Sequence, residues 1–140
     1  MRVPFPCLLV ALSLIAITPA LDARAAEDCD TPNSDMAQLR DSYGKAYKKS
    51  DSELNTLYKQ IMSRLKDDEP TTKLLVTAQK AWVAFRDAEC DFSTSRSSGG
   101  TIYPMIQAIC LDKLTSKRVG ELKTYLKCQE GDMDCPVPAQ

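Results

Sequence analysis

The chain has 140 residues, a net charge of −1 and no histidine. Without histidine, the sequence excludes His-based acid–base catalysis, Ser-His and Cys-His nucleophile pairs, and most zinc sites. The charges are mixed and form no basic block, so we expect no nucleic-acid partner.

The first segment, residues 1–25, has the pattern of a secretory signal peptide. Arg2 gives a short basic start, and the apolar run LLVALSLIAI that follows is too short for a transmembrane helix. The tripeptide Ala-Arg-Ala ending at Ala25 fits a cleavage site, so we expect a mature chain of residues 26–140. Cleavage after Ala20 and an uncleaved membrane anchor are the alternatives. Export predicts a periplasmic or extracellular protein with no membrane span in the mature chain.

The first predicted helix covers about residues 35–66. Its apolar residues recur at steps of three and four, as on one face of an amphipathic helix: Met36, Leu39, Tyr43, Tyr47, Leu54, Tyr58, Ile61 and Leu65. One seven-residue gap in this face contains Asp51, a carboxylate beside the predicted core. The run DDEP at residues 67–70 ends this helix and begins the next, because proline is favoured in a first turn.

The second predicted helix covers about residues 71–92. Its apolar face is predicted to consist of Leu74, Ala78, Ala81, Phe85 and Phe92. A line of polar and apolar side chains, the mixed seam, borders this face. Its residues fall within roughly 80° of arc around the helix axis, at about 100° per residue. The seam consists of Gln79, Trp82, Arg86 and Cys90. We expect Trp82 to pack in the core, because Leu75 and Phe85 flank it.

A polar loop, STSRSSGG at residues 93–100, precedes a third predicted helix over about residues 104–126. The inward residues of this helix are predicted to be Ile106, Cys110, Leu114, Val119, Leu122 and Tyr125. The tail, residues 127–140, is rich in turn residues and is predicted to be irregular. The sequence therefore predicts an all-α fold, a small bundle of three antiparallel helices with disulfides and an irregular tail.

Cleavage of the signal segment leaves an odd number of cysteines in an oxidising compartment. Cys90 falls late in the second helix and Cys110 early in the third, so a short loop brings them close. Their disulfide closes a loop of about 20 residues and is worth about 3 kcal/mol. Cys128 and Cys135 form the next candidate pair, which leaves Cys29 unassigned. A competing scheme bonds Cys29 to one of the two tail cysteines.

Five polar residues near the predicted core are candidates for a structural network: Asp51, Asn55, Gln79, Arg86 and Arg118. A carboxylate beside a core needs partners, and Arg86 or Arg118 can supply a bidentate pair. The amides can complete the hydrogen bonding. The alternative is a ligand or catalytic site built from the same residues.

Four blocks of the sequence are shared with a known family: DSELN--Y at 51–58, AQKAWVAFRDAEC at 78–90, SGGTIYPMI---C at 98–110, and T--R---L at 115–122. On these blocks the chain resembles the LprI-like lysozyme-inhibitor domain family of secreted bacterial proteins, over about residues 43–126. The resemblance implies a helical domain and inhibition of lysozyme. Members of the family often carry a second N-terminal cysteine where this chain has Ser42, which implies that Cys29 is the odd thiol.

The candidate partner-binding loop follows the second helix and is predicted to be held at its base by the Cys90–Cys110 disulfide. Its candidate residues are Ser95, Arg96, Ser97, Ser98, Gly99, Gly100 and Tyr103. A loop held in this way is pre-organised, which lowers the cost of binding, and Arg96 can enter a cleft lined with carboxylates.

We expect a protein-binding module that requires no cofactor or metal. The resemblance implies that it inhibits lysozyme-type glycosidases, and we expect it to do so by occluding the cleft. The alternative is an envelope-associated structural or interaction protein with a non-lysozyme partner. Enzymatic activity is not expected, because no carboxylate pair has a spacing signature of a glycosidase.

Overall fold

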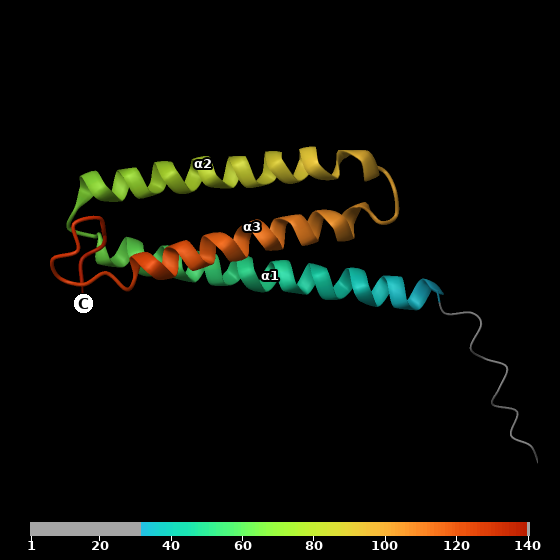
Figure 1. The fold of residues 1–140 in the computed structure, drawn as a ribbon, viewed down its shortest axis with the longest axis horizontal. Coiled ribbons are helices and arrows are strands. Elements are labelled where there is room, and N and C mark those ends of the chain that lie inside the picture. Colours follow the sequence, from blue (N-terminus) through green and yellow to red (C-terminus); the bar gives the residue numbers. More distant parts are fainter. Residues whose placement is uncertain (1–31, 140) are drawn as a thin grey trace, which may run out of the picture. The chain divides into compact units, whose positions relative to one another are not determined.

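The computed structural model describes residues 32–139, which form three long helices (Figure 1). A 3-10 turn connects the second helix to the third, and residues 126–139 follow without further helix. The elements are α1 (Pro32–Arg64), α2 (Glu69–Thr94), η1 (Ser95–Ser97) and α3 (Tyr103–Tyr125). Within the described range there is no strand. The predicted all-α, three-helix fold with an irregular tail is therefore confirmed.

The predicted signal segment, its two candidate cleavage sites and Cys29 lie outside the described residues. Between residues 32 and 139, no helix combines the length and the apolar character needed to cross a membrane.

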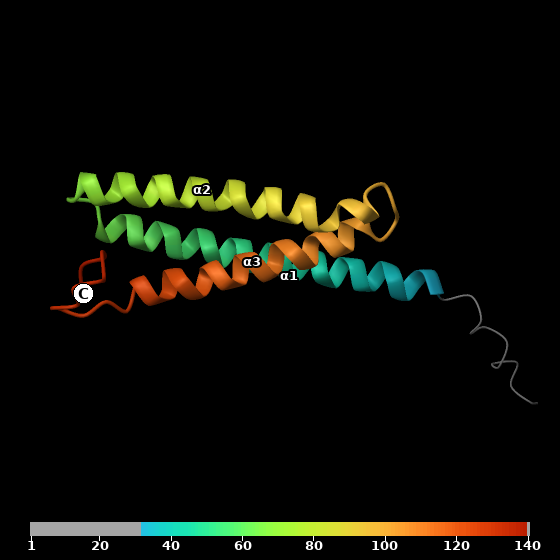
Figure 2. The same cartoon turned by 45° about the horizontal axis from the view of Figure 1, so that its top comes forward.

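The helices form an uneven bundle, in which α1 and α3 pack closely and α2 lies beside this pair with fewer contacts (Figures 1 and 2). The buried core lies in the C-terminal half of α1, the C-terminal half of α3 and the tail. Its members are Leu54, Leu57, Ile61, Leu65, Val119, Leu122, Cys128 and Val137. Burial of each large aliphatic side chain contributes about 1.5–3 kcal/mol. From α2, Leu75 and Trp82 pack against this core with part of their surface exposed.

The junction between α1 and α2 is fixed by local hydrogen bonds. Asp68 caps α2, since its Oδ1 accepts a hydrogen bond from the Thr71 N–H at 3.1 Å. Pro70 lies in the first turn of α2. Backbone N–H groups there have no partner within the helix, so a proline costs no hydrogen bond. The Thr72 hydroxyl donates to the Leu65 carbonyl at 2.9 Å, which ties the start of α2 to the end of α1.

The tail closes on itself and covers one end of the core. Cys128 is bonded to Cys135, and their Cα atoms are 5.7 Å apart. The competing scheme, in which Cys29 bonds one of these two, is therefore wrong. Val137 is only 3% exposed, so the irregular tail contributes a core residue that the sequence analysis did not predict.

The predicted apolar face of α2 is wrong. Leu74, Phe85 and Phe92 are 71%, 56% and 77% exposed, whereas Arg86 and Cys90 of the mixed seam are buried. The contacts of the seam set the rotation of α2 about its axis, because Arg86 and Cys90 both bond to α3.

The predicted apolar face of α1 is correct only in part. Leu54, Ile61 and Leu65 are buried, but Met36, Leu39 and Tyr43 are 37%, 41% and 36% exposed. The N-terminal end of α1 extends beyond the loop that joins α2 to α3 (Figure 1), so its first turns have little of the bundle to pack against.

Replacing Asp68 by alanine is expected to lower the Tm at pH 7, because alanine cannot cap α2. Hydrogen bonds from the Thr71 side chain and backbone lower the pKa of Asp68. A carboxyl with a lowered pKa in the folded state stabilises above its unfolded pKa of about 3.9. This stabilisation is lost as the pH falls through the folded pKa.

Thermal melts at pH 7 and at about pH 2 measure this effect as a gap in Tm between wild type and Asp68→Ala. The gap is expected to shrink in acid. The control variant Asp68→Asn keeps an acceptor and is expected to melt closer to wild type at pH 7. A gap that stays constant or widens in acid would contradict the role given to the Asp68 carboxylate.

Candidate functional site

Arg86 of α2 is a buried guanidinium that contacts both other helices. The residue is 7% exposed. Its Nη1 donates to Asp51 Oδ1 of α1 at 3.2 Å and to Thr115 Oγ1 of α3 at 3.4 Å. Its Nε donates to Asp87 Oδ1 at 2.9 Å. A buried charge is stable only when it is paired and hydrogen-bonded, so these three contacts together allow Arg86 to lie between the helices.

Aromatic rings complete the surroundings of this guanidinium. The Arg86 Cζ atom lies 5.3 Å from the centroid of the Trp82 ring and 5.7 Å from that of Tyr47. Arg118 of α3 approaches the same Trp82 ring, with its Cζ 5.9 Å from the centroid. Cation–π contacts are favourable at these distances. Trp82 therefore joins the charged groups of α2 and α3 while it packs against the core.

The pKa of Arg86 and that of Tyr47 are both raised. Burial has the largest influence on the pKa of Arg86 and lowers it, but the hydrogen bond to Asp87, the charges of Tyr47 and Asp87, and the hydrogen bond to Asp51 together outweigh it. Burial raises the pKa of Tyr47, and the cationic Arg86 offsets part of that rise. Near neutral pH, Arg86 therefore remains a cation and Tyr47 a neutral phenol, and neither is suited to proton transfer.

Arg118 belongs to a second, neighbouring set of contacts. Its Nε donates to Gln79 Oε1 at 3.2 Å, and its Nη1 forms an ion pair with Glu121 Oε2 at 2.8 Å. It is not the partner of Asp51. The five predicted network residues thus divide into two sets, which approach each other through Trp82.

Asp51 lies at the edge of a groove between α1 and α2. The groove has a volume of about 450 Å³ and is lined by Asp51, Leu54, Asn55, Tyr58, Val76, Gln79, Lys80, Val83 and Arg86. The side chain of Asp51 is 38% exposed, and its Oδ2 accepts a hydrogen bond from Asn55 Nδ2 at 3.1 Å. The carboxylate is therefore partly hydrated, so the buried member of the pair is Arg86.

Three contributors to this cluster were not predicted from the sequence: Tyr47, Asp87 and Thr115. The apolar periodicity of α1 predicts a core position for Tyr47 and gives no sign of its contact with Arg86. Thr115 is completely buried and lies three residues before Arg118, a spacing that places the two on one face of α3. That spacing was the signal that could have identified Thr115.

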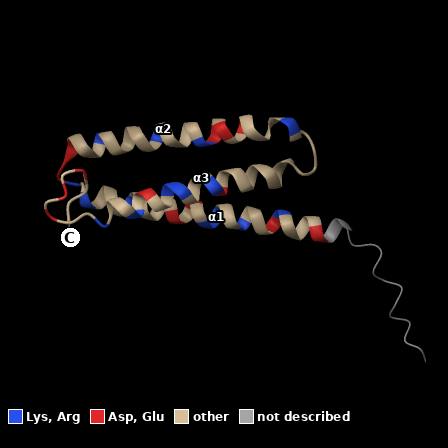
Figure 3. Ribbon diagram, in the orientation of Figure 1, with Lys and Arg blue, Asp and Glu red and all other residues tan. Residues whose placement is uncertain are grey.

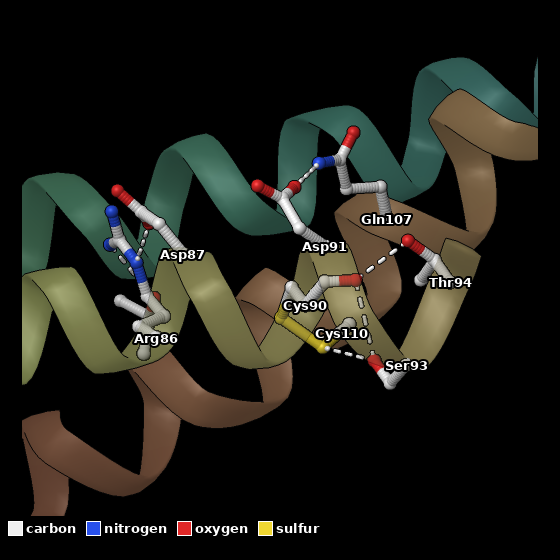
Figure 4. The surroundings of a disulfide bond; sticks show 9 residues. Arg86, Asp87, Cys90, Asp91, Ser93, Thr94, Gln107 and Cys110 are labelled. Atoms are coloured by element: carbon white, nitrogen blue, oxygen red, sulfur yellow. Dashed lines mark hydrogen bonds and ion pairs between the residues drawn. A yellow bond between two sulfur atoms is a disulfide. The ribbon is translucent and has the colours of Figure 1, made fainter. Parts of the chain in front are cut away.

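Two contacts hold the end of α2 against the start of α3 (Figure 4). The predicted Cys90–Cys110 disulfide is present, with Cα atoms 5.7 Å apart. Beside the disulfide, Nε2 of Gln107 on α3 donates a hydrogen bond to Oδ1 of Asp91 on α2 at 2.9 Å. The Thr94 hydroxyl donates to the Cys90 carbonyl at 2.6 Å and closes the last turn of α2. The base of the loop is therefore fixed on both helices.

The loop itself is a chain of tight turns. Backbone hydrogen bonds of 3.0–3.1 Å close the turns over residues 95–98, 97–100 and 100–103. Gly99 has φ 79°, which an L side chain rarely adopts. A Cβ atom at Gly100 would lie 3.1 Å from the Ser97 carbonyl oxygen, closer than most Cβ contacts. Both glycines are therefore needed for this loop conformation.

The loop residues differ in their accessibility to a partner. Exposed are Ser95, Arg96, Ser98, Gly99 and Gly100, whereas Ser97 and Tyr103 are partly buried. Arg96 has no ion-pair partner among residues 32–139, and Figure 3 shows basic colour at this end of the bundle. Arg40 Nη1 donates to the Thr101 carbonyl at 3.3 Å, which links the loop to α1. No group of three or more acidic or cysteine side chains in the described range could hold a metal ion.

The fold and the loop together define a disulfide-bonded helical module. The comparisons agree with that class of protein. The family model of the lysozyme inhibitor LprI matches residues 28–122, and the chain belongs to this family. A relative, the uncharacterized protein R02472 of Rhizobium meliloti (strain 1021), is 29% identical over 141 residues, which cover 93% of this chain and 99% of the relative. No solved structure matches the chain.

Replacing Arg86 by alanine is expected to lower the free energy of unfolding by about 2–4 kcal/mol. Loss of one partner of a buried pair costs about 3–5 kcal/mol, and the partial hydration of Asp51 reduces that cost. Urea unfolding measures this change. The variant Arg86→Met keeps most of the side-chain volume and is expected to lose less. An unfolding curve of Arg86→Ala that coincides with that of wild type would exclude a structural role for this cluster.

Proposed function

We propose that the mature protein inhibits a lysozyme-type glycosidase by occluding its substrate cleft, and that it does so in the periplasm or outside the cell. The observation that carries this proposal is the match of residues 28–122 to the lysozyme inhibitor LprI family. The pattern of a signal peptide at residues 1–25 supports the compartment. In this proposal the protein acts as a binding partner and catalyses no reaction.

The loop of residues 93–103 is the contact surface that we propose. Glycosidases of this type use a pair of carboxylates on either side of the scissile bond, and an arginine guanidinium pairs with a carboxylate through two parallel hydrogen bonds. Arg96 is exposed at the loop and has no competing ion pair in the described part of the chain. The disulfide and the turns fix the loop before binding, so little ordering entropy is lost.

Apolar side chains on either side of the loop support this surface. Phe92 at the end of α2 is 77% exposed, and Ile102 just before α3 is 40% exposed. Protein interfaces commonly combine an arginine with exposed aromatic and aliphatic side chains at their centre. This loop end therefore offers a cationic group with an apolar surround.

The alternative function is an envelope-associated interaction protein with a non-lysozyme partner. It uses the same exposed loop end, so the surface does not distinguish the two functions. A pull-down from a periplasmic extract distinguishes them, because excess lysozyme displaces the captured partner if the loop end binds lysozyme and leaves it bound if the loop end binds only a partner of another class.

Initial rates of cell-wall hydrolysis by several lysozyme types, titrated with the mature protein, test the proposed function. Inhibition of at least one type is expected at near-stoichiometric ratios. The variant Arg96→Ala is expected to raise the inhibition constant at least about tenfold, a loss typical of a charged residue that anchors an interface. Its Tm is expected to remain that of wild type, because Arg96 is exposed.

The matched control is Lys66→Ala, which removes an exposed cation at the junction of α1 and α2, at the opposite end of the bundle from the loop. This variant is expected to inhibit as well as wild type. Full lysozyme activity in excess wild-type protein, for every type assayed, would refute the proposed function. Equal inhibition by Arg96→Ala and wild type would refute only the contact surface.

A further inference from the structure

The exposed side of α2 carries an apolar stripe, whose N-terminal members Leu74 and Ala78 also line a hollow beside α1, α3 and the tail. We define the α2 stripe as Leu74, Ala78, Ala81, Phe85, Ala88 and Phe92, all of which are exposed. The steps between its members alternate between four and three residues, the spacing of a coiled-coil seam. At about 100° per residue, the six lie within roughly 80° of arc. The three large members retain 71%, 56% and 77% of their exposure, so residues 32–139 leave the stripe uncovered.

The stripe is self-complementary in one orientation. Its members lie at equal distances on either side of Val83: residues 81 and 85, 78 and 88, and 74 and 92. When a second α2 runs antiparallel, each phenylalanine faces a smaller side chain. Phe85 lies opposite Ala81 of the other copy, and Phe92 opposite Leu74. A two-fold dimer requires a surface of this kind, on which residue i contacts j and j contacts i.

The charges along one edge of the stripe agree with this orientation. Lys73 and Lys80 flank the N-terminal half of the stripe on that side, and Asp87 and Asp91 flank the C-terminal half, about 100–140° around the helix from the centre of the stripe and all exposed. In an antiparallel pair the lysines of one copy lie level with the aspartates of the other. In a parallel pair this edge of one copy would lie on the opposite side of the seam from the same edge of the other copy, so these charges would not meet. Pairing of opposite charges at the edge fixes the register of two helices.

We propose that the α2 stripe is a self-association surface on which two copies of this chain pair as an antiparallel helix dimer. The stripe is about 27 Å long at 1.5 Å per residue. A single helix pair of this length buries less than the about 1,600 Å² of a standard interface. The dissociation constant is therefore expected to be micromolar, on the order of 1–100 µM. The two loops of residues 93–103 then lie at opposite ends of the dimer.

Sedimentation of the mature, oxidised protein over about 1–300 µM tests for the dimer, a range that brackets the expected constant. The weight-average mass is expected to rise from one chain to two and to stop there. The variant Phe85→Lys places a charge in the centre of the stripe and is expected to weaken dimerisation at least about tenfold. The matched control Gln60→Lys adds the same charge at an exposed site of α1 and is expected to dimerise as wild type does.

Disulfide crosslinking tests the orientation, in a Cys29→Ser background that removes the odd thiol. The variants Ala78→Cys and Ala88→Cys lie opposite each other in the antiparallel register. A mixture of the two is expected to form crosslinked dimers rapidly, and neither variant alone is expected to do so. Far-UV circular dichroism of each variant confirms that the helices are intact.

Four results would overturn the proposal. A mass of one chain at all concentrations would exclude self-association, and growth beyond two chains would exclude a closed two-fold dimer. Crosslinking of each cysteine variant with itself would indicate a parallel pair. A monomeric wild type whose lysozyme inhibition is lost in Phe85→Lys would assign the stripe to lysozyme instead. Because sedimentation uses the protein alone, its result is independent of the proposed function.

Discussion

The structure depends on one buried charge, the guanidinium of Arg86. It lies on α2 and donates hydrogen bonds to Asp51 of α1 and Thr115 of α3, while Asp87 accepts from its Nε. A buried charge without partners is strongly unfavourable, so the relative positions of the three helices must provide all of these acceptors. This requirement gives α2 a defined rotation in a bundle where it makes fewer contacts than the other two helices.

The rotation of α2 determines what the protein presents to its surroundings. When Arg86 points inward, Cys90 one turn later lies beside Cys110 and can bond to it. The same rotation turns Phe85 outward, where it is 56% exposed. A fixed loop at one end and an apolar stripe along one side are thus two consequences of the same packing. The two surfaces meet at Phe92, which ends the stripe and flanks the loop, whereas their other members differ.

The order of the helices, the loops between them and the Cys90–Cys110 disulfide were predictable from the sequence, because apolar periodicity, proline position and cysteine spacing are local signals. The sequence offered Cys128–Cys135 only as a candidate pair and left a bond from either residue to Cys29 open. The inward face of α2 was not predictable, because amphipathic helices usually place their more apolar face inside. On α2, a seam with Trp82, Arg86 and Cys90 is inside, because acceptors on other helices satisfy its polar members. The partners of Arg86 come from positions 35 residues before it and 29 residues after it, and a single sequence does not show which distant residues meet.

The most direct test of the account is a double-mutant cycle between Asp51→Asn and Arg86→Met, measured by equilibrium unfolding in urea. The protein concentration is kept below about 0.1 µM, about tenfold under the lowest dissociation constant expected for the dimer. If Arg86 joins α1 to α2, the losses in free energy of unfolding of the two single variants will add up to about 0.5–1.5 kcal/mol more than the loss of the double variant. This coupling is at the lower end for residues in contact, because Asp51 is partly hydrated. Additivity within about 0.3 kcal/mol would contradict the central claim, since it would show that the two side chains contribute to stability independently.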